Sequence, residues 1–216
     1  MAEPLNHELQ RQLRELALLR DEDIDTSDIP EVTDWSRATR PSQPEASYAE
    51  KDYDIRAVAN AVLKSAWDRG LEVTNMSLNK LVFFVLERAL VERNVWLTKA
   101  RLEAWDHGPV FREIYTHSKK FGEQPVTELI KAYSVHQRRF LDVPTQLDEE
   151  TAADIKAVTD KLAHFPAARL RALSHSKDSA WDWVYNASQK TSAGMVISPV
   201  MILASARRRS VTRGRR

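Results

Sequence analysis

The residues of this chain that could do chemistry are scattered along it. Glu103, Asp106 and His107 form the closest grouping of possible proton donors and acceptors. General acid–base catalysis needs such groups to converge on a substrate. Asp106 and His107, however, directly precede a Gly–Pro pair, where short polar side chains commonly bond to the local backbone and stabilise a turn. We therefore interpret the segment 106–109 primarily as a turn whose polar side chains bond to the local backbone.

The sequence shows no pattern of a metal site or an activated nucleophile. Catalytic metal sites often place His and carboxylate ligands three or four residues apart on a helix, and the histidines do not follow that spacing. The chain has no cysteine, which removes thiolate nucleophiles, disulfides and Cys-based metal sites. It also lacks a Gly-x-Ser-x-Gly elbow and a phosphate-binding glycine loop. We therefore expect no enzyme, no catalytic residues, no metal, no cofactor and no small-molecule substrate. The six histidines are His7, His107, His117, His136, His164 and His175.

Lys80 stands inside a strongly apolar segment that runs from Leu78 to Phe84. It can lay its aliphatic stem along the interior and reach toward water. It can instead make a fixed contact with a carboxylate, for which Glu103 is a candidate, or with backbone carbonyl groups. Each reading gives Lys80 a role in the architecture rather than in catalysis.

Charge is concentrated at the two ends of the chain, although the formal net charge is only +1. Seven acidic and no basic residues lie between Asp21 and Asp34, whereas six arginines and no acid lie between Arg207 and Arg216. Such segments are typical of interaction tails. The arginines, in a segment 206–216 that we expect to be a disordered tail, could contact nucleic-acid phosphates. Positive charge is also favoured at a helix C-terminus without any ligand.

The chain carries no sign of membrane insertion or export. No apolar run approaches the roughly 20 residues that span a bilayer. Glu3, Glu8 and Arg11 interrupt the place where a signal peptide would have its apolar core. Together with the lack of cysteine, this predicts a soluble cytoplasmic protein that does not bind membranes.

The N-terminal 47 residues differ in character from the rest. Leucines at near-helical spacing predict a helix over 1–20, docked on its own domain or on a partner. Residues 21–47 combine three prolines with many acidic and hydroxyl side chains, which predicts an extended acidic arm. Apolar residues such as Trp35 serve no purpose in a purely solvating linker. We expect the arm to bind a partner protein in preference to its own domain.

Residues 48–205 are expected to form one mainly helical, all-α domain. Asp54 caps a first helix that ends at Gly70, and Thr74 or Asn75 caps a central, almost fully buried helix over 76–92. Residues 93–106 lose the helical pattern, so a short two-stranded element is expected near 95–105. Gly is too scarce, at 5 residues, for an all-β protein with many tight turns.

The second half of the domain is also expected to be helical. Pro109 suits a first helical turn, which predicts a helix from the Gly108–Pro109 turn to about Phe121. A short helix or turn is predicted over 126–134, while 135–145 is ambiguous. Further helices are expected over 148–163 and after Pro166 and Pro199. The residues assigned to the core are Leu78, Leu81, Phe84 and Trp105.

Four segments then follow one another in a characteristic order. They are Tyr53-Asp54-Ile55-Arg56-Ala57-Val58-Ala59-Asn60; the Thr74-Asn75 cap with Leu78, Lys80, Leu81 and Phe84; Glu103-Ala104-Trp105 with His107-Gly108-Pro109-Val110 and Tyr115; and Leu173-Ser174-His175 with Trp181. In this order, from about Tyr53 to Leu203, the chain resembles the Panacea antitoxin domain, a family that also contains SocA-type proteolytic adaptors. The family usually has Gln at the position of Asn79.

The resemblance implies a non-enzymatic antitoxin that neutralises a cognate protein toxin, encoded by a neighbouring gene, by direct binding. A proteolytic adaptor that delivers the toxin to a protease, and a nucleic-acid-binding regulator that uses Arg207–Arg216, are the alternatives. The residues that carry the family signature are expected to be structural. They are Asn75, Leu78, Lys80, Leu81, Phe84, Trp105, His107, Gly108, Pro109 and Val110. The arm lies outside the resemblance and is a natural place for specificity. Its candidate toxin-binding residues are Ile24, Asp25, Asp28, Ile29, Val32 and Trp35.

Overall fold

The computed structural model describes Arg11, residues 48–187 and residues 195–213. The segment from Ala46 to Arg216 forms one compact unit, most of which is described. The expected N-terminal helix, apart from Arg11, and the whole acidic arm lie outside the described residues. The same holds for the candidate toxin-binding residues Ile24, Asp25, Asp28, Ile29, Val32 and Trp35.

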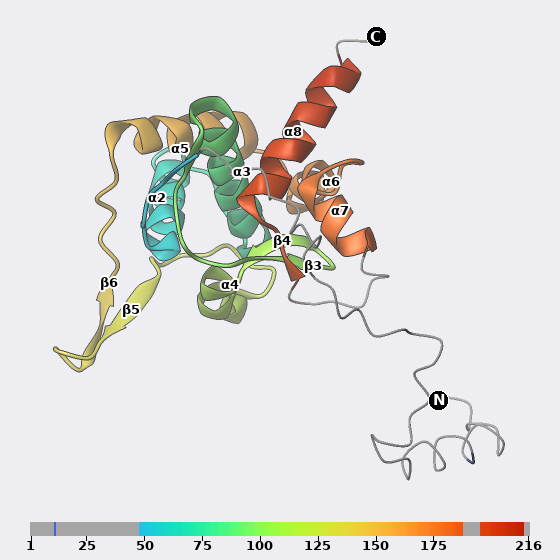
Figure 1. Ribbon diagram of the computed structural model, residues 1–216. Coiled ribbons are helices and arrows are strands. Elements are labelled where there is room, and N and C mark those ends of the chain that lie inside the picture. The colour runs from blue at the N-terminus through green and yellow to red at the C-terminus, as the bar shows by residue number, and fades with distance from the viewer. Residues whose placement is uncertain (1–10, 12–47, 188–194, 214–216) are drawn as a thin grey trace, which may run out of the picture. The chain divides into compact units, whose positions relative to one another are not determined.

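The unit is mostly helical, and a long central helix, α3 (Asn75–Arg93), organises it (Figure 1). α3 packs against α2, α5, α6 and α8 and also against β2 and β4. The other helices are α2 (Ile55–Trp67), α4 (Arg112–Ser118), the 3-10 turn η2 (Lys119–Phe121), α5 (Glu149–Leu162), α6 (Ala167–Ser174), α7 (Ala180–Ala187) and α8 (Pro199–Arg213).

The predicted helix starts are confirmed where a capping side chain was visible in the sequence. Asp54 accepts a hydrogen bond from the backbone N–H of Arg56 at the start of α2. The Thr74 hydroxyl accepts from the N–H of Ser77 at the start of α3, and Asp148 caps α5 in the same way. Such caps satisfy N–H groups that have no partner inside the helix. α3 ends at Asn94, whose left-handed backbone (φ 59°) stops the helix.

Within the described residues, seven short strands form three small sheets, so this part of the chain is not purely α-helical. β1 pairs in parallel with β2, β3 lies between β4 and β7, and β5 and β6 form a separate hairpin. The strands are β1 (Ala49–Glu50), β2 (Val95–Trp96), β3 (Leu102–Trp105), β4 (Gly108–Phe111), β5 (Lys131–Ser134), β6 (Arg139–Asp142) and β7 (Met195–Val196).

The strand positions near 95–105 were predicted correctly, but their expected pairing with each other is wrong. β2 adds to β1, whereas β3 pairs with β4 in the register Leu102 with Phe111 and Trp105 with Gly108. The expected helix start at Pro109 is also wrong, because Gly108–Phe111 is β4 and α4 begins only at Arg112. The neighbouring strand β3 pairs with these residues in a tight hairpin, and this pairing overrides the local preference of Pro109.

Two further expectations need correction. Residues 126–134 hold no helix; they lead into β5, the first strand of a hairpin that projects from the unit (Figure 1). α8 extends to Arg213, so residues 206–213 are helical where a disordered tail was expected. Arg209 forms an ion pair with Glu87 of α3 at 2.5 Å. Arg208 lies 3.3 Å from Asp178. Both contacts fix the extended helix on the unit.

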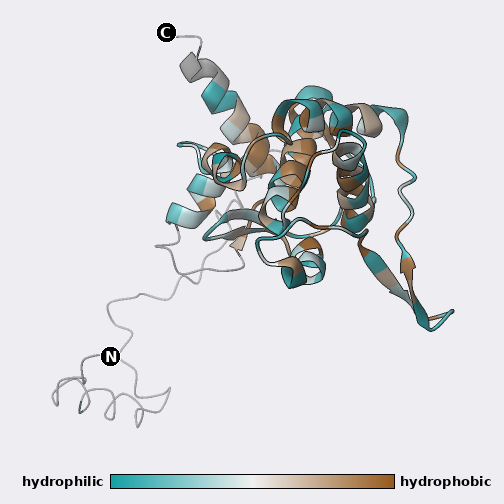
Figure 2. Cartoon of the chain, turned by 180° about the vertical axis from the view of Figure 1, so that it is seen from behind, coloured by the Kyte–Doolittle hydropathy of each residue, from teal (hydrophilic) through white to brown (hydrophobic). Residues whose placement is uncertain are grey.

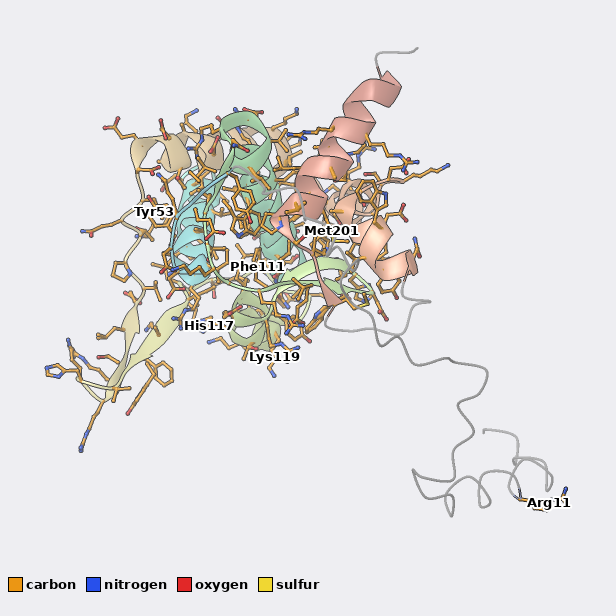
Figure 3. All side chains as sticks on the ribbon, in the orientation of Figure 1. Arg11, Tyr53, Phe111, His117, Lys119 and Met201 are labelled. Atoms are coloured by element: carbon orange, nitrogen blue, oxygen red, sulfur yellow. The ribbon has the colours of Figure 1, made fainter. Side chains whose placement is uncertain are left out.

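The core is built around the apolar faces of α2 and α3. Figure 2 shows hydrophobic residues gathered on these helices and on the first turns of α8, while the hairpin tip is hydrophilic. Phe111 is fully buried in the interior and Lys119 lies on the surface (Figure 3). The predicted core positions Leu78 and Leu81 are fully buried. Phe84 and Trp105, predicted as core, are only half-buried, since both lie at the margin of the packed interior.

Asn60 fixes the chain ahead of the hairpin from within the core. Its amide donates to the carbonyl oxygen of Ile130 at 2.9 Å and accepts from the Ile130 N–H at 2.7 Å, and the side chain is fully buried. Replacing Asn60 with leucine would leave the Ile130 N–H without a partner and the Ile130 carbonyl oxygen with only the 3.4 Å bond from the Val143 N–H. We expect the free energy of unfolding to fall by about 2–4 kcal/mol in urea denaturation. The exposed Asn186→Leu is the control, and a loss for Asn60→Leu no greater than for this control would refute the role.

Candidate binding pocket

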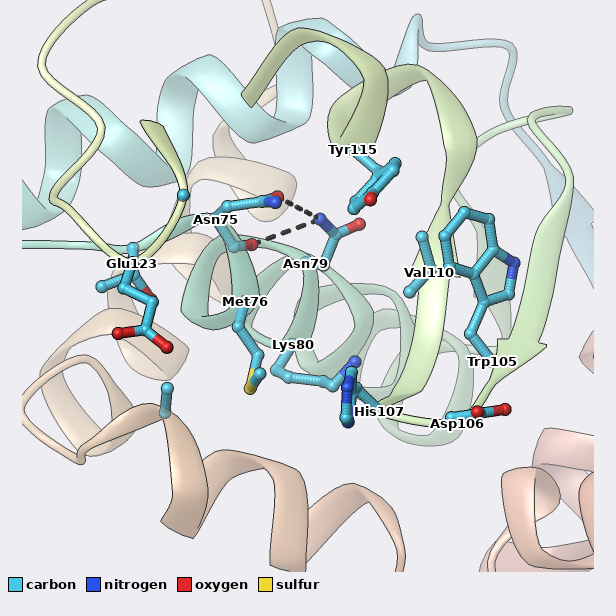
Figure 4. A pocket seen from close by; sticks show the side chains of 13 residues that line it. Asn75, Met76, Asn79, Lys80, Trp105, Asp106, His107, Val110, Tyr115 and Glu123 are labelled. Atoms are coloured by element: carbon cyan, nitrogen blue, oxygen red, sulfur yellow. Dashed lines mark hydrogen bonds between the residues drawn. The ribbon is translucent and has the colours of Figure 1, made fainter. Parts of the chain in front are cut away.

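A pocket of about 560 Å³ opens between the start of α3, the β3–β4 turn and α4 (Figure 4). Met76, Val110, Tyr115 and the half-buried Trp105 give it apolar and aromatic walls. Its polar lining includes Lys80 and the side chains of Asn75 and Asn79, His107, Asp106 and Glu123. Several residues quoted for the sequence resemblance thus line one cavity, although they are far apart in the chain.

Lys80 is the least expected member of this lining, because it is a lysine of which only 1% is exposed. Its Nζ donates a 2.8 Å hydrogen bond to the carbonyl oxygen of Pro109, so the backbone alternative of the sequence analysis is the correct one. Burial, and after it the nearby positive charge of Arg171, lowers the pKa of Lys80 to about 7. The bond ties the centre of α3 to β4.

Glu103 was suggested as the partner of Lys80, but its carboxylate instead contacts Trp105 and Arg112. Its carboxylate accepts from Trp105 Nε1 at 2.8 Å and from Arg112 at 3.0 and 3.2 Å. Burial alone would raise the pKa of Glu103, but these hydrogen bonds hold that pKa below its ordinary value. The contact fixes the indole of Trp105, which meets the Tyr115 ring edge-on at 4.9 Å. The aromatic wall of the pocket is therefore held in one orientation.

Two asparagines extend the tie between α3 and the sheet. The Asn79 side chain accepts from the Phe111 N–H at 3.1 Å and donates to Asn75, as the dashed lines in Figure 4 show for the second contact. Asn75 in turn accepts from the Ser118 hydroxyl of α4 at 2.6 Å. The position of Asn79, where the family usually has Gln, is thus occupied by a buried amide that satisfies a β4 backbone group.

The β3–β4 turn at the pocket rim is braced by α6 and α7. Trp181 Nε1 donates to the Trp105 carbonyl oxygen at 2.8 Å, and the Tyr185 hydroxyl donates to Asp106 Oδ1 at 2.8 Å. Arg171 of α6 contacts the Asp106 carbonyl oxygen at 3.3 Å. Asp106 thus lies in a turn, as expected from sequence, but its carboxylate accepts a hydrogen bond from a distant helix instead of the expected one from the local backbone.

His175 packs behind the turn, with its ring stacked on Trp181 at 3.6 Å between centroids. Its Nε2 is buried and makes no hydrogen bond within the described structure. Burial, followed by the charges of Arg171 and Lys80, lowers the pKa of His175 to about 4. The ring is therefore neutral at physiological pH and adds no positive charge to this end of the pocket.

Gly108 allows Lys80 and His175 to approach the turn. Its φ is +103°, and a Cβ built on it would lie 2.7 Å from Lys80 Cε and 2.9 Å from both Lys80 Nζ and His175 Nε2. Real Cβ atoms do not come this close to other atoms, so the position needs glycine for space as well as for conformation. The sequence identified Gly108 as a turn residue but gave no sign of this packing.

The structure brings together most of the signature residues but not all of them. Asn75, Lys80, Trp105, His107 and Val110 line the pocket, and Gly108 and Pro109 pack directly behind it. Leu78, Leu81 and Phe84 do not line it and belong to the packing of α3. The sequence analysis missed Met76, Glu123 and Ala167 as lining residues, because nothing in their type or spacing distinguishes them.

The described residues show neither a metal-binding cluster nor a membrane-spanning helix. There, no group of three or more His, Asp or Glu side chains is placed to hold a metal ion. None of the helices in the described part of the chain combines the length and the apolar character that a membrane crossing requires.

Comparisons with known proteins give a family match and a similar protein. Residues 78–182 match the family described as "Antitoxin SocA-like, Panacea domain", a range that includes Lys80, the β3–β4 turn and α6. The chain is 27% identical over 143 residues to Antitoxin SocA of Caulobacter vibrioides, which covers 66% of this chain and 76% of that protein. No solved structure gives a significant match. Over residues 78–182 the chain is therefore similar to the SocA-like Panacea domain family.

Proposed function

We propose that this protein is an antitoxin that neutralises a cognate protein toxin by direct binding, without catalysis. The observation that carries the proposal is the likeness, over 143 residues, to a protein named Antitoxin SocA. The family match over residues 78–182 supports the same role. The toxin would be the product of a neighbouring gene and would be met in the cytoplasm.

The hairpin β5–β6 supports the idea of a protein partner. Tyr133 and Phe140 pair across its two strands with ring centroids 5.3 Å apart, yet their side chains are 53% and 66% exposed. Val135 at the tip is 81% exposed. Aromatic side chains dominate the energy of many protein interfaces, and here they stand exposed on a projecting ribbon. We infer that the hairpin contributes to the surface that the toxin contacts.

The acidic arm remains our candidate for specificity. Ile24, Ile29, Val32 and Trp35 would supply apolar anchors, and Asp25 and Asp28 would supply charge that could mimic phosphate if the toxin acts on RNA or nucleotides. This assignment rests on the composition of the arm and on its position outside the matched family range.

A growth assay tests the proposed function and the arm together. The neighbouring open reading frame is induced alone, with the full chain, and with a chain that lacks residues 1–47. We expect arrest by the toxin alone, recovery with the full chain, and weaker protection by the truncated chain at equal protein levels. Absence of arrest from either neighbouring gene would remove the antitoxin proposal. Full protection by the truncated chain would instead assign neutralisation to residues 48–216.

Two other functions can be separated from this one. A proteolytic adaptor would lower the amount of toxin in the cell rather than hold it in a complex. A nucleic-acid-binding regulator would use the arginines of α8 and beyond, and its binding would weaken steeply with salt. Arg208 and Arg209 already form ion pairs with Asp178 and Glu87, which favours a role for them in anchoring α8.

A further inference from the structure

The pocket beside Lys80 has the dimensions of a small-molecule site. Its volume of about 560 Å³ falls within the range of roughly 300–1,000 Å³ that is usual for ligand pockets. Trp105, Tyr115, Met76 and Val110 give it a largely apolar wall, and the Glu103 carboxylate fixes the Trp105 ring. Such a wall suits a flat aromatic or aliphatic group.

The polar end of the pocket carries positive charge without a matching carboxylate. Lys80 is buried, and its Nζ donates one hydrogen bond, to the Pro109 carbonyl oxygen. An ammonium group can donate three hydrogen bonds. Among the described residues, no carboxylate forms an ion pair with Lys80, in contrast to Lys51, Lys99, Lys120 and Lys156, which all have one. Figure 4 shows the Lys80 side chain running along the pocket toward His107.

The groups around Lys80 add to this excess of positive over negative charge. Arg171 lies close enough to influence both Lys80 and His175 electrostatically. Of the two carboxylates in the lining, Asp106 accepts from the Tyr185 hydroxyl, and Glu123 enters from the segment after η2. Burying an ammonium group without a counter-charge is costly, so an anion that reached Lys80 would relieve that cost and gain a charge-assisted hydrogen bond.

We propose that this pocket binds a small carboxylic acid with an apolar body, its carboxylate on Lys80 Nζ and its body between Met76, Trp105 and Tyr115. The ligand is a free small molecule, because the pocket is larger than one inserted side chain needs. The proposal does not depend on a toxin, and its failure would leave the proposed antitoxin function intact. A bound acid would tie α3 to the β3–β4 turn and could therefore regulate the domain.

Binding of such an acid should depend on pH in a defined direction. The carboxylate needs charged Lys80, whose pKa is about 7, so affinity should be highest near pH 6. It should fall roughly tenfold between pH 7.5 and pH 8.5. The other charged or titratable groups that face this end are Asp106, His107, Arg171 and His175. Of these, His175 is already neutral above its pKa of about 4.

Calorimetric titration of the full chain at pH 6.5 tests the proposal. The probes are benzoate, phenylacetate, indole-3-acetate and octanoate, each compared with its neutral amide. We expect at least one acid to bind with Kd below about 1 mM and at least tenfold more tightly than its amide. Binding of no acid in this range, or equal binding of acid and amide, would overturn the proposal.

Two pairs of variants locate the binding. Lys80→Met should remove the preference for the acid, whereas Lys99→Met, at an exposed lysine paired with Asp52, should not. Because a core variant can fail to fold, Ala167→Phe tests the pocket independently: Ala167 lines the pocket, and its exposed neighbour Ala168 does not. Ala167→Phe should weaken binding at least tenfold and Ala168→Phe should leave it unchanged. Unaltered binding to Ala167→Phe would place the ligand elsewhere and refute the assignment.

Discussion

A Lys80→Met variant is expected to lose a pH dependence of stability that the unaltered chain shows between pH 7 and pH 10. Lys80 has a folded-state pKa of about 7 and an ordinary pKa near 10.4 when unfolded. In this window the unfolded chain holds a proton that the folded chain has released, so the free energy of unfolding rises with pH. The slope from one such group is about 1.4 kcal/mol per pH unit.

The difference in unfolding free energy between the unaltered chain and Lys80→Met should therefore rise by about 2–3 kcal/mol from pH 7.5 to pH 9.5. Urea denaturation across this range measures it, and all other titrating groups cancel in the difference. Methionine also removes the hydrogen bond to Pro109, but that loss is the same at each pH. Parallel curves for the two proteins would show that Lys80 keeps an ordinary pKa. Lys99→Met, at an exposed site, is the control: it shows how replacing a lysine with methionine changes the unfolding free energy where the lysine is not buried.

A Gly108→Ala variant is expected to lose about 2–6 kcal/mol of stability. The positive φ of +103° is unfavourable for a residue with a side chain, at a cost on the order of 1–3 kcal/mol. The new methyl group would also meet Lys80 Cε at 2.7 Å and His175 Nε2 at 2.9 Å, and overpacking adds about 1–3 kcal/mol. A retreat of the Lys80 side chain from the new methyl group would break its hydrogen bond to the Pro109 carbonyl oxygen.

Gly70→Ala is the matched control for this experiment. Gly70 also has a positive φ, of +67°, but nothing lies within 4 Å of a Cβ built there. Gly70→Ala should lose only the stability that the positive φ costs a residue with a side chain. Gly108→Ala should therefore be the more destabilised variant by at least about 1 kcal/mol. Equal losses would mean that the turn, Lys80 and His175 are less closely packed than the geometry indicates.

The sequence predicted the helices well where local signals decide the structure. The caps at Asp54, Thr74 and Asp148 and the broad apolar pattern of α3 are local features, and each prediction from them is confirmed. The segment 108–111 was assigned wrongly because Pro109 is locally compatible with a helix start. Its actual state depends on β3 and on the contacts of Lys80 and Asn79, which no local pattern reveals.

The candidate pocket could be predicted only in part, because its residues are brought together by contacts that no local pattern reveals. The resemblance identified Lys80, Trp105, His107 and Gly108 as a signature, but their convergence depends on how β4 packs on α3. Trp105 was expected to be a core residue because of its type, and it is instead a half-buried wall held by Glu103. The low exposure of Lys80 and its lack of a carboxylate partner among the described residues follow from packing and cannot be read from composition.

Direct and stable binding of the toxin is the central claim, and co-purification tests it most directly. The tagged chain is produced together with the product of the neighbouring gene, and the amount of toxin is measured in the cell and in the eluate. The account predicts that toxin accumulates in protected cells and elutes with the tagged chain as a stable complex. Protected cells in which the toxin disappears, with none in the eluate, would contradict neutralisation by binding and identify the protein as an adaptor for proteolysis.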